Sequence, residues 1–311
     1  MRPHPRAMRQ ANPSIDAITA LRMTRPGFGA ITLAGCLLGF ALAHRDGLAV
    51  TVWPAIGVLV VSVLLHAAAN VLNDYEDARS GADAANHSGI FPFTGGARLI
   101  QNGVVTPEQT RHLAIGLLIA AVPIGLWLAW LGGWVSVWLG LAGLLLGWAY
   151  SSPPLILMHR GAGEVGVGLT WALLVMGADA VFRRHLDPAV AWVAAGYGAL
   201  IANILLINAY PDALADASVG KRTAVVRLGP ARAAWLYAVF LVLSQCVLVV
   251  ALMQGLLPMA STWAMLSGLM GCDAWRRLRR AAQTPQDLRG AIVRTIATAL
   301  LYSLLVAWGC W

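Results

Sequence analysis

The sequence predicts an all-α polytopic membrane protein, and three observations lead to this prediction. Of the 311 residues, 59% are hydrophobic and only 12% are charged, with a mean hydropathy of +0.68, whereas soluble domains carry about 25% charged residues. Apolar runs of about 20 residues, enough to cross a bilayer as a helix, recur along the whole chain. The alternation typical of membrane β-strands is absent from the sequence, so helices remain the structure that satisfies backbone polar groups in lipid.

Nine apolar runs are candidates for membrane-spanning helices. They cover residues 27–44, 49–73, 112–130, 134–150, 163–182, 188–210, 232–254, 256–271 and 291–310. The eighth run is the shortest of the nine. Residues 1–25 are polar and rich in arginine, so we expect a cytoplasmic N-terminal segment there and a single transmembrane domain over residues 26–311.

Basic residues are distributed unevenly between the loops. With the N-terminus in the cytoplasm, 19 of the 22 Lys and Arg residues fall in cytoplasmic segments, and only Arg45, Arg183 and Arg184 lie on the other side. Basic loops stay in the cytoplasm, so nine spans predict a C-terminus outside. The net charge of +8 reports this topology, and we expect the lipid bilayer, but no nucleic acid and no obligate protein partner, around the chain.

Two acidic clusters follow apolar runs on the predicted cytoplasmic side, although the chain has only 14 Asp and Glu residues. The first cluster covers residues 73–83 and the second covers residues 208–216. Each contains an Asn and an Asp four residues apart, and this pattern repeats after 135 residues. The weak repeat predicts two pseudo-equivalent four-helix halves plus a ninth helix around a central cavity, with the two clusters facing each other across it.

The spacing within the clusters predicts a metal site. Residues four apart share one face of a helix, so each cluster forms a ridge of oxygen ligands. Such oxygens suit Mg²⁺, which takes one or two carboxylates and completes its shell with water and substrate phosphates. A solvated helix end would explain one cluster, but two matched clusters at a membrane face favour a functional site, because carboxylates there are costly. The predicted ligands are Asn73, Asp77, Asp83, Asn208, Asp212 and Asp216.

A basic loop that contains glycine follows each acidic cluster. The loops cover residues 94–98 and 220–223, and the second holds Lys221, the single lysine of the chain. Glycine lets the backbone approach a ligand closely, and Lys and Arg neutralise phosphate oxygens. Arg98, Lys221 and Arg222 are therefore candidate phosphate contacts, although anchoring at the cytoplasmic surface would also explain basic residues here.

Other polar residues have two possible roles. Tyr150 and Arg160 flank the segment between the two predicted halves and are either substrate contacts or interfacial anchors. Arg79, inside the first cluster, is a further candidate substrate contact. For His66 and Asp179, which lie within apolar runs, the sequence does not separate a functional from a structural role.

Together these residues resemble the UbiA superfamily of membrane prenyltransferases. The family motifs Asn-Asp-x-x-Asp and Asn-x3-Asp-x3-Asp match residues 73–77 and 208–216. The chain looks most like the branch that prenylates 1,4-dihydroxy-2-naphthoate. The matching features are residues 80–83, Gly95-Gly96-x-Arg98, residues 150–164, and residues 220–223 followed by 226–229. It departs from that branch at Tyr210-Pro211, where an Arg usually precedes the Asp, and at Ser80, where Lys is frequent.

The resemblance implies Mg²⁺-dependent transfer of a polyprenyl group from an isoprenyl diphosphate to an aromatic acceptor, most closely 1,4-dihydroxy-2-naphthoate in menaquinone biosynthesis. It implies that the six predicted ligands hold Mg²⁺ at the diphosphate, while the basic loops neutralise the leaving group. Asp77 and Asp212 would be catalytic, and Asp74 would orient the donor or deprotonate the acceptor. The enzyme would lie in the bacterial cytoplasmic (inner) membrane.

Two alternatives remain open at this point. The same chemistry could act on 4-hydroxybenzoate, homogentisate or a (bacterio)chlorophyllide-type alcohol. A secondary transporter also uses repeats and broken helices, but transporter sites usually lie near the bilayer midplane, whereas both acidic clusters lie at one face. The sequence does not determine the acceptor, the prenyl chain length or the oligomeric state.

Overall fold

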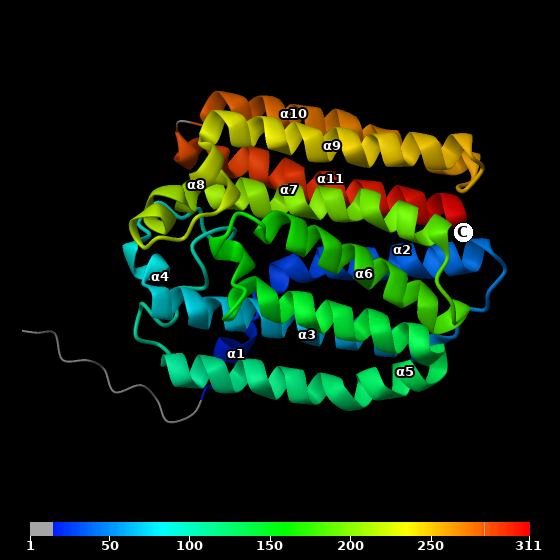
Figure 1. Ribbon diagram of the computed structural model, residues 1–311, viewed down its shortest axis with the longest axis horizontal. Helices are drawn as coiled ribbons and strands as arrows, with labels where there is room; N and C mark the ends of the chain where they lie inside the picture. Colours follow the sequence, from blue (N-terminus) through cyan, green and yellow to red (C-terminus); the bar gives the residue numbers. More distant parts are fainter. Residues whose placement is uncertain (1–14, 283) are drawn as a thin grey trace, which may run out of the picture.

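The computed structural model describes residues 15–282 and 284–311, and helices are the only regular secondary structure in this part of the chain. The long helices lie side by side in one bundle (Figure 1). They are α2 (Gly29–Arg45), α3 (Val52–Ser80), α5 (Pro107–Ser151), α6 (Gly163–Arg183), α7 (Pro188–Ser218), α9 (Pro230–Met253), α10 (Leu266–Ala281) and α11 (Arg289–Cys310).

Short helices connect the long ones. The α-helical ones gather at one end of the bundle, on the left in Figure 1. They are α1 (Ala17–Met23), α4 (Ala82–Ala85) and α8 (Ala224–Leu228), and the 3-10 turns are η1 (Pro26–Phe28), η2 (Leu157–His159), η3 (Met259–Met265) and η4 (Pro285–Leu288).

Seven described helices are long and apolar enough to cross a membrane, namely α2 with η1, α3, α5, α6, α7, α9 and α11. Within α5, Gly133 has a non-helical φ of 72° and ψ of −164°, so α5 consists of two helical segments that match the runs predicted at 112–130 and 134–150. Figure 1 shows α5 turning back on itself at the right-hand end of the bundle. The prediction of nine crossings is not settled by these lengths, because α10 has only 16 residues.

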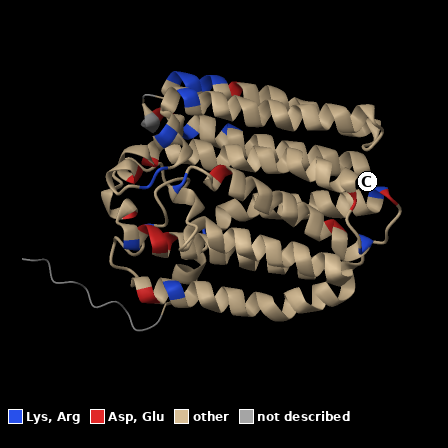
Figure 2. Ribbon diagram, viewed as in Figure 1, with Lys and Arg blue, Asp and Glu red and all other residues tan. Residues whose placement is uncertain are grey.

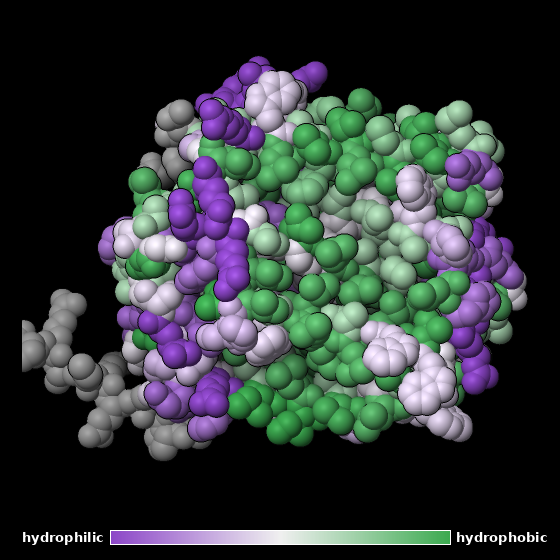
Figure 3. All heavy atoms as spheres, in the orientation of Figure 1, coloured by the Kyte–Doolittle hydropathy of each residue, from purple (hydrophilic) through white to green (hydrophobic). Residues whose placement is uncertain are grey.

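The surface is that of a multi-pass membrane protein. Figure 3 shows a broad apolar belt between two hydrophilic bands at the ends of the bundle. Figure 2 shows that most charged residues lie at the same two ends. A belt of this kind can face lipid, since helices pair most of their backbone polar groups internally.

Two helices continue past the predicted ends of their apolar runs. The second run was predicted to end at residue 73, but α3 continues to Ser80 and ends where Gly81 adopts a φ of 81°. Glycine is favoured at this left-handed C-terminal position. α7 likewise continues to Ser218. The acidic clusters therefore occupy the last helical turns themselves, which fixes the direction of their side chains.

α7 lies at the centre of the bundle, packed against α6, α9 and α11. Its buried residues include Tyr197, whose hydroxyl donates to the carbonyl of Ile31 in α2. The amide of Asn203 donates to the carbonyl of Tyr237 in α9 at 3.0 Å. These hydrogen bonds join α7 to α2 and to α9. They fix the position of α7, and with it the second acidic cluster at its C-terminal end.

An ion-pair network closes the end of the bundle opposite the short helices. Arg183 at the end of α6 pairs with Asp179 (2.7 Å), Asp46 (2.6 Å) and Asp187 (3.1 Å). Asp179 is only 1% exposed, and its carboxylate is engaged by Arg183. The structure therefore gives Asp179 a structural role, which is to hold Arg183 on the same helix, while Arg183 joins α6 to Asp46 before α3 and to Asp187 before α7.

The closest approach between α6 and α7 depends on two glycines. A Cβ atom on Gly198 would lie 2.3 Å from the carbonyl oxygen of Gly168. We predict that Gly198→Ala lowers the melting temperature of the purified protein in detergent, because a rigid backbone contact would cost about 1–3 kcal/mol. Gly177→Ala in α6 is the control, since a Cβ there meets nothing within 4 Å. Equal melting temperatures of both variants would contradict this account of the packing.

Candidate functional site

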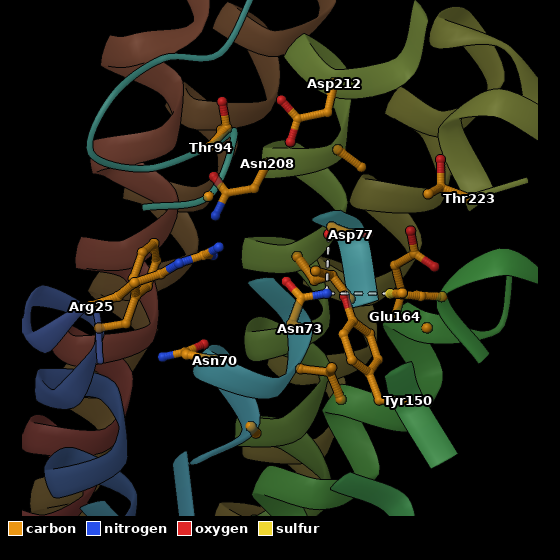
Figure 4. Close-up of a pocket in the computed structure, with 18 of the residues that line it drawn as sticks. Arg25, Asn70, Asn73, Asp77, Thr94, Tyr150, Glu164, Asn208, Asp212 and Thr223 are labelled. Atoms are coloured by element: carbon orange, nitrogen blue, oxygen red, sulfur yellow. Dashed lines mark hydrogen bonds between the residues drawn. The ribbon is translucent and has the colours of Figure 1, made fainter. Parts of the chain in front are cut away.

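A cavity of about 200 Å³ lies between α2, α3, α5, α6 and α7, at the end of the bundle with the short helices. Figure 4 shows Arg25, Asn73 and Asn208 pointing toward one another across this space. The predicted central cavity is therefore present. The predicted site residues that line it are Asn73, Asp77, Asp83, Tyr150, Asn208, Asp212, Asp216 and Lys221.

α3 and α4 supply one side of the cavity. Asn73 and Asp77 lie one turn apart on α3, and the Asn73 amide donates to Asp77 Oδ2 at 3.2 Å. The left-handed Gly81 then turns the chain into α4, which places the buried Asp83 against the same space. Only Gly81 separates α3 from α4, so Asp83 stays close to the α3 residues of the cavity.

α7 supplies the opposite side. Asn208, Asp212 and Asp216 follow one another at intervals of one turn, and all three line the cavity. Pro211 lies inside the helix beside Asp212, where its missing N–H leaves one carbonyl without a helical partner. The Asn208 Oδ1 atom is buried and has no hydrogen-bond partner.

Lys221 connects the two sides. Its Nζ lies 2.9 Å from Asp77 Oδ1 and 3.4 Å from Asp216 Oδ1, and the residue is only 9% exposed. Burial opposes the charge of Lys221, but the attraction of the two carboxylates outweighs it and raises the pKa of this amine. The lysine thus stays a cation within the site.

The loop between α4 and α5 covers Asp212. The Asn86 amide donates to Asp212 Oδ1 at 2.7 Å, and the Gly95 N–H donates to Asp212 Oδ2 at 3.3 Å. Gly96 has a φ of 69°, and a Cβ there would lie 3.0 Å from Asp83 Oδ2. The glycines therefore let the backbone of this loop approach the carboxylates closely.

Arg98 stabilises this loop through hydrogen bonds to backbone carbonyls. Its Nη1 donates to the carbonyls of Asn86 (2.6 Å) and Asp83 (3.3 Å). Arg98 is not among the residues that line the cavity. In this structure its contacts are with protein carbonyls that position the loop.

Arg25, at the start of η1, is a site residue that sequence reasoning missed. It lines the cavity and forms an ion pair with Asp74. Burial opposes its charge, but attraction by Asp74 and Asp83 raises the pKa of Arg25. In the sequence, Arg25 is one of several basic residues before the first apolar run. Nothing in the sequence distinguishes it from an arginine that anchors the chain at the membrane surface.

Besides Arg98, four further predicted residues lie outside the cavity lining. Asp74 faces Arg25 and the N–H of Ala97 (3.3 Å). The other three are exposed arginines. The side chain of Arg79 pairs with Glu76 at 3.1 Å, and that of Arg160 donates to the carbonyl of Pro154 at 2.7 Å. The backbone carbonyl of Arg222 accepts from Arg227 at 3.1 Å. Their predicted substrate contacts stay predictions that no comparison tests.

The cavity continues deeper along α3 than the motif does. Asn70 and His66 lie one and two turns below the level of Asn73, on the same face, and both line the cavity. His66 Nδ1 hydrogen-bonds Thr32 Oγ1 at 2.7 Å, and its ring lies edge-on to Trp171 at 4.9 Å. The helical spacing of these residues was the signal that could have placed them in the site.

The donor set fits a cation that is bound together with an anionic substrate. Five carboxylates line the cavity, against the two basic side chains Arg25 and Lys221. The unpartnered Asn208 Oδ1 adds a neutral oxygen ligand. Among the described residues, no three His, Cys, Asp or Glu side chains lie close enough to hold a metal on their own. Mg²⁺ suits this arrangement, since it uses one or two carboxylates and completes its shell with water and phosphate.

Comparison with known proteins identifies the family of this chain. The model of the UbiA prenyltransferase family matches residues 32–308. The chain belongs to the UbiA prenyltransferase family. It is thus a membrane prenyltransferase, and the family predicted from the two motifs is confirmed.

Relatives within the family share a modest part of the sequence over most of the chain. The 1,4-dihydroxy-2-naphthoate octaprenyltransferase of Escherichia coli K12 is 28% identical over 305 residues, covering 93% of this chain and 94% of that protein. The protein of the same name from Mycobacterium tuberculosis is 27% identical, covering 82% of this chain and 84% of that protein.

Solved structures of UbiA homologues share the fold. The homologue from Aeropyrum pernix K1 has a TM-score of 0.70 at 16% identity, covering 90% of this chain and 97% of that chain. The homologue from Archaeoglobus fulgidus, bound to GPP and Mg²⁺, has a TM-score of 0.60 at 15% identity, covering 93% of this chain and 97% of that chain.

The buried carboxylates generate a prediction about stability and pH. Burial, followed by repulsion from Asp77 and Asp74, raises the pKa of Asp83 from 3.8 to about 7. The folded protein therefore binds this proton more tightly than the unfolded chain does, and ionising Asp83 costs stability increasingly as pH rises from 3.8 to about 7.

We predict that Asp83→Asn raises the melting temperature of the protein in chelator, and that its advantage over the wild type is larger at pH 8 than at pH 5. The amide cannot ionise, but it keeps the volume of the carboxyl group and can still accept from Gln101 Nε2, now 3.2 Å away. Differential scanning fluorimetry at both pH values measures the two differences. Equal differences would show that ionisation of Asp83 is not the cause.

Proposed function

We propose that this protein transfers a polyprenyl group from an isoprenyl diphosphate to an aromatic acceptor in a Mg²⁺-dependent reaction, with 1,4-dihydroxy-2-naphthoate as the acceptor. The observation that carries the proposal is the pair of Asn and Asp ridges that face each other across one cavity, connected by Lys221. The naphthoate acceptor is supported by the names of the relatives that match over most of their length.

The acidic residues bind the donor through the metal. We assign Mg²⁺ binding to the oxygens of Asn73, Asp77, Asp83, Asn208, Asp212 and Asp216, of which Asp77 and Asp212 are central to catalysis. When bound, Mg²⁺ neutralises phosphate oxygens and so stabilises the charge that develops as the diphosphate leaves.

The basic residues of the cavity complete the diphosphate site. Lys221 and Arg25 are buried cations whose pKa values are raised, so they can neutralise the leaving group without losing their protons. Arg98 acts indirectly by holding the loop whose Gly95 N–H faces Asp212. Asp74 positions Arg25 through their ion pair.

The apolar part of the cavity places the reacting carbons. Side chains such as Phe28, Ile31, Val167 and Leu205 exclude water around the prenyl group, which protects an allylic cation from hydrolysis. The C–O bond breaks with its electron pair going to the diphosphate. The electron-rich ring then forms the new C–C bond, and with 1,4-dihydroxy-2-naphthoate the ring carboxylate leaves as carbon dioxide, which restores aromaticity.

We further propose the topology that the charge distribution predicts. All nine apolar segments, with α5 counted as two and η3 with α10 as one, cross the bacterial inner membrane. Residues 1–25 form the cytoplasmic N-terminal segment, residues 26–311 form one prenyltransferase domain, and the C-terminus lies outside. The cavity then opens at the cytoplasmic face.

A panel of acceptors tests the proposed reaction. Purified protein with Mg²⁺ and octaprenyl diphosphate should give a prenylated product that has lost carbon dioxide when 1,4-dihydroxy-2-naphthoate is supplied, detected by mass spectrometry. Chelation of Mg²⁺ should abolish the product. A product with 4-hydroxybenzoate or homogentisate alone would reject the naphthoate acceptor, and no product with any acceptor would reject prenyl transfer.

Substitutions in the two ridges test the residue assignment. We predict that Asp77→Asn and Asp212→Asn each lower kcat roughly 100-fold or more, since each removes a charge that would hold Mg²⁺ at the leaving group. Glu76→Gln is the matched control, because Glu76 pairs with Arg79 outside the cavity. Wild-type turnover in either Asp variant, at equal protein levels, would show that the substituted carboxylate is not needed for catalysis.

A further inference from the structure

A cluster of unpaired arginines lies on the surface of α9 and α10, away from the cavity. It consists of Arg232, Arg276, Arg279 and Arg280, all exposed, and we call it the arginine cap. Figure 2 shows basic residues gathered at the upper left, where α10 ends and α9 begins. This is the end of the bundle that also holds the cavity.

The arginine cap has no acidic partner among the described residues. The neighbouring carboxylate of Asp273 is shared by Arg277 (2.8 Å) and Arg294 (2.5 Å). Arg276 and Arg280 lie one turn apart on the same helix face, where two like charges destabilise a helix. An anion bound between them would relieve this repulsion.

One arginine of the cap is held in place by aromatic rings. The guanidinium of Arg279 lies 5.0 Å from the ring centre of Trp235 and 5.2 Å from that of Trp275. The Trp275 indole is itself fixed by a hydrogen bond to the carbonyl of Ala234 at 2.8 Å. This cation–π stacking orders the side chain before any ligand arrives.

The surface next to the arginine cap is apolar. Trp235, Val239, Val242 and Leu243 on α9 and Leu269 on α10 are all exposed. Figure 3 shows hydrophilic atoms at the upper left, followed along the top of the bundle by apolar ones. Cations above an apolar flank match an amphiphile with an anionic head, whereas a free phosphate ion would use only the cations.

We propose that the arginine cap is a binding site for an anionic phospholipid of the leaflet at the cavity end. The guanidinium groups of Arg276, Arg279, Arg280 and Arg232 donate to the phosphate and the anionic headgroup, because planar guanidinium suits phosphate oxygens. Trp235 lies at the boundary between headgroup and acyl chains, as interfacial tryptophans do. The acyl chains then follow the apolar surface of α9 and α10.

Native mass spectrometry of the full chain in neutral detergent tests the proposal. The wild type should retain phosphatidylglycerol in preference to phosphatidylcholine, and added salt should weaken the binding. In Arg276→Gln/Arg280→Gln the apparent Kd for phosphatidylglycerol should rise roughly 25-fold, since each arginine near a membrane surface contributes about fivefold. Arg276→Lys/Arg280→Lys keeps both charges but loses the planar donors, so its Kd should lie between those of the wild type and the Gln variant.

The control removes two exposed arginines elsewhere. Arg22→Gln/Arg111→Gln has the same net charge as the test variant, and both residues lie outside the arginine cap and the cavity lining. Its Kd should stay within twofold of the wild type. Equal losses in both double variants would overturn the site in favour of a general charge effect. Competition by inorganic phosphate as strong as that by the lipid would overturn the phospholipid as its ligand.

Discussion

The ion pairs of Lys221 with Asp77 and Asp216 are the interaction on which the cavity end of the bundle depends. They join α3 to α7 across a sequence separation of 144 residues. The backbone N–H of Lys221 also donates to the carbonyl of Asp216 at 2.8 Å, which closes the end of α7. Without this cation, the carboxylates that α3, α4, α6 and α7 supply to the cavity would repel one another with less compensation.

The cavity nevertheless keeps an excess of negative charge, since five carboxylates face Arg25 and Lys221. A fold optimised for stability alone would replace some of these groups with apolar or neutral residues. Their presence indicates that the site is stabilised by a cationic ligand, and that the free protein carries a destabilised site for the sake of function. Asn86 and Gly95 reduce this cost at Asp212 by donating hydrogen bonds to both of its oxygens.

Hydropathy and spacing were enough to predict the helices and the two facing ridges, because burial in lipid and the period of the α-helix act locally along the chain. Arg25 and Asn86 were missed because their partners lie 49 and 126 residues away, a relation that one sequence does not contain. Arg79, predicted as a substrate contact inside the first cluster, pairs with Glu76 in this structure, and its substrate contact stays a prediction. Closeness in sequence identified the segments that form the cavity. The geometry of the helices decides which side chains of those segments line it.

The network of Arg183 with Asp46, Asp179 and Asp187 has a mechanical consequence for the whole bundle. It fastens three segments at the end opposite the cavity, so any tilt of a helix pivots there. A helix of 20 residues is about 30 Å long, and a tilt of about 5° about one end displaces the other by roughly 2.6 Å. A small tilt about this end would therefore change the width of the bundle most at the cavity and least at the ion pairs.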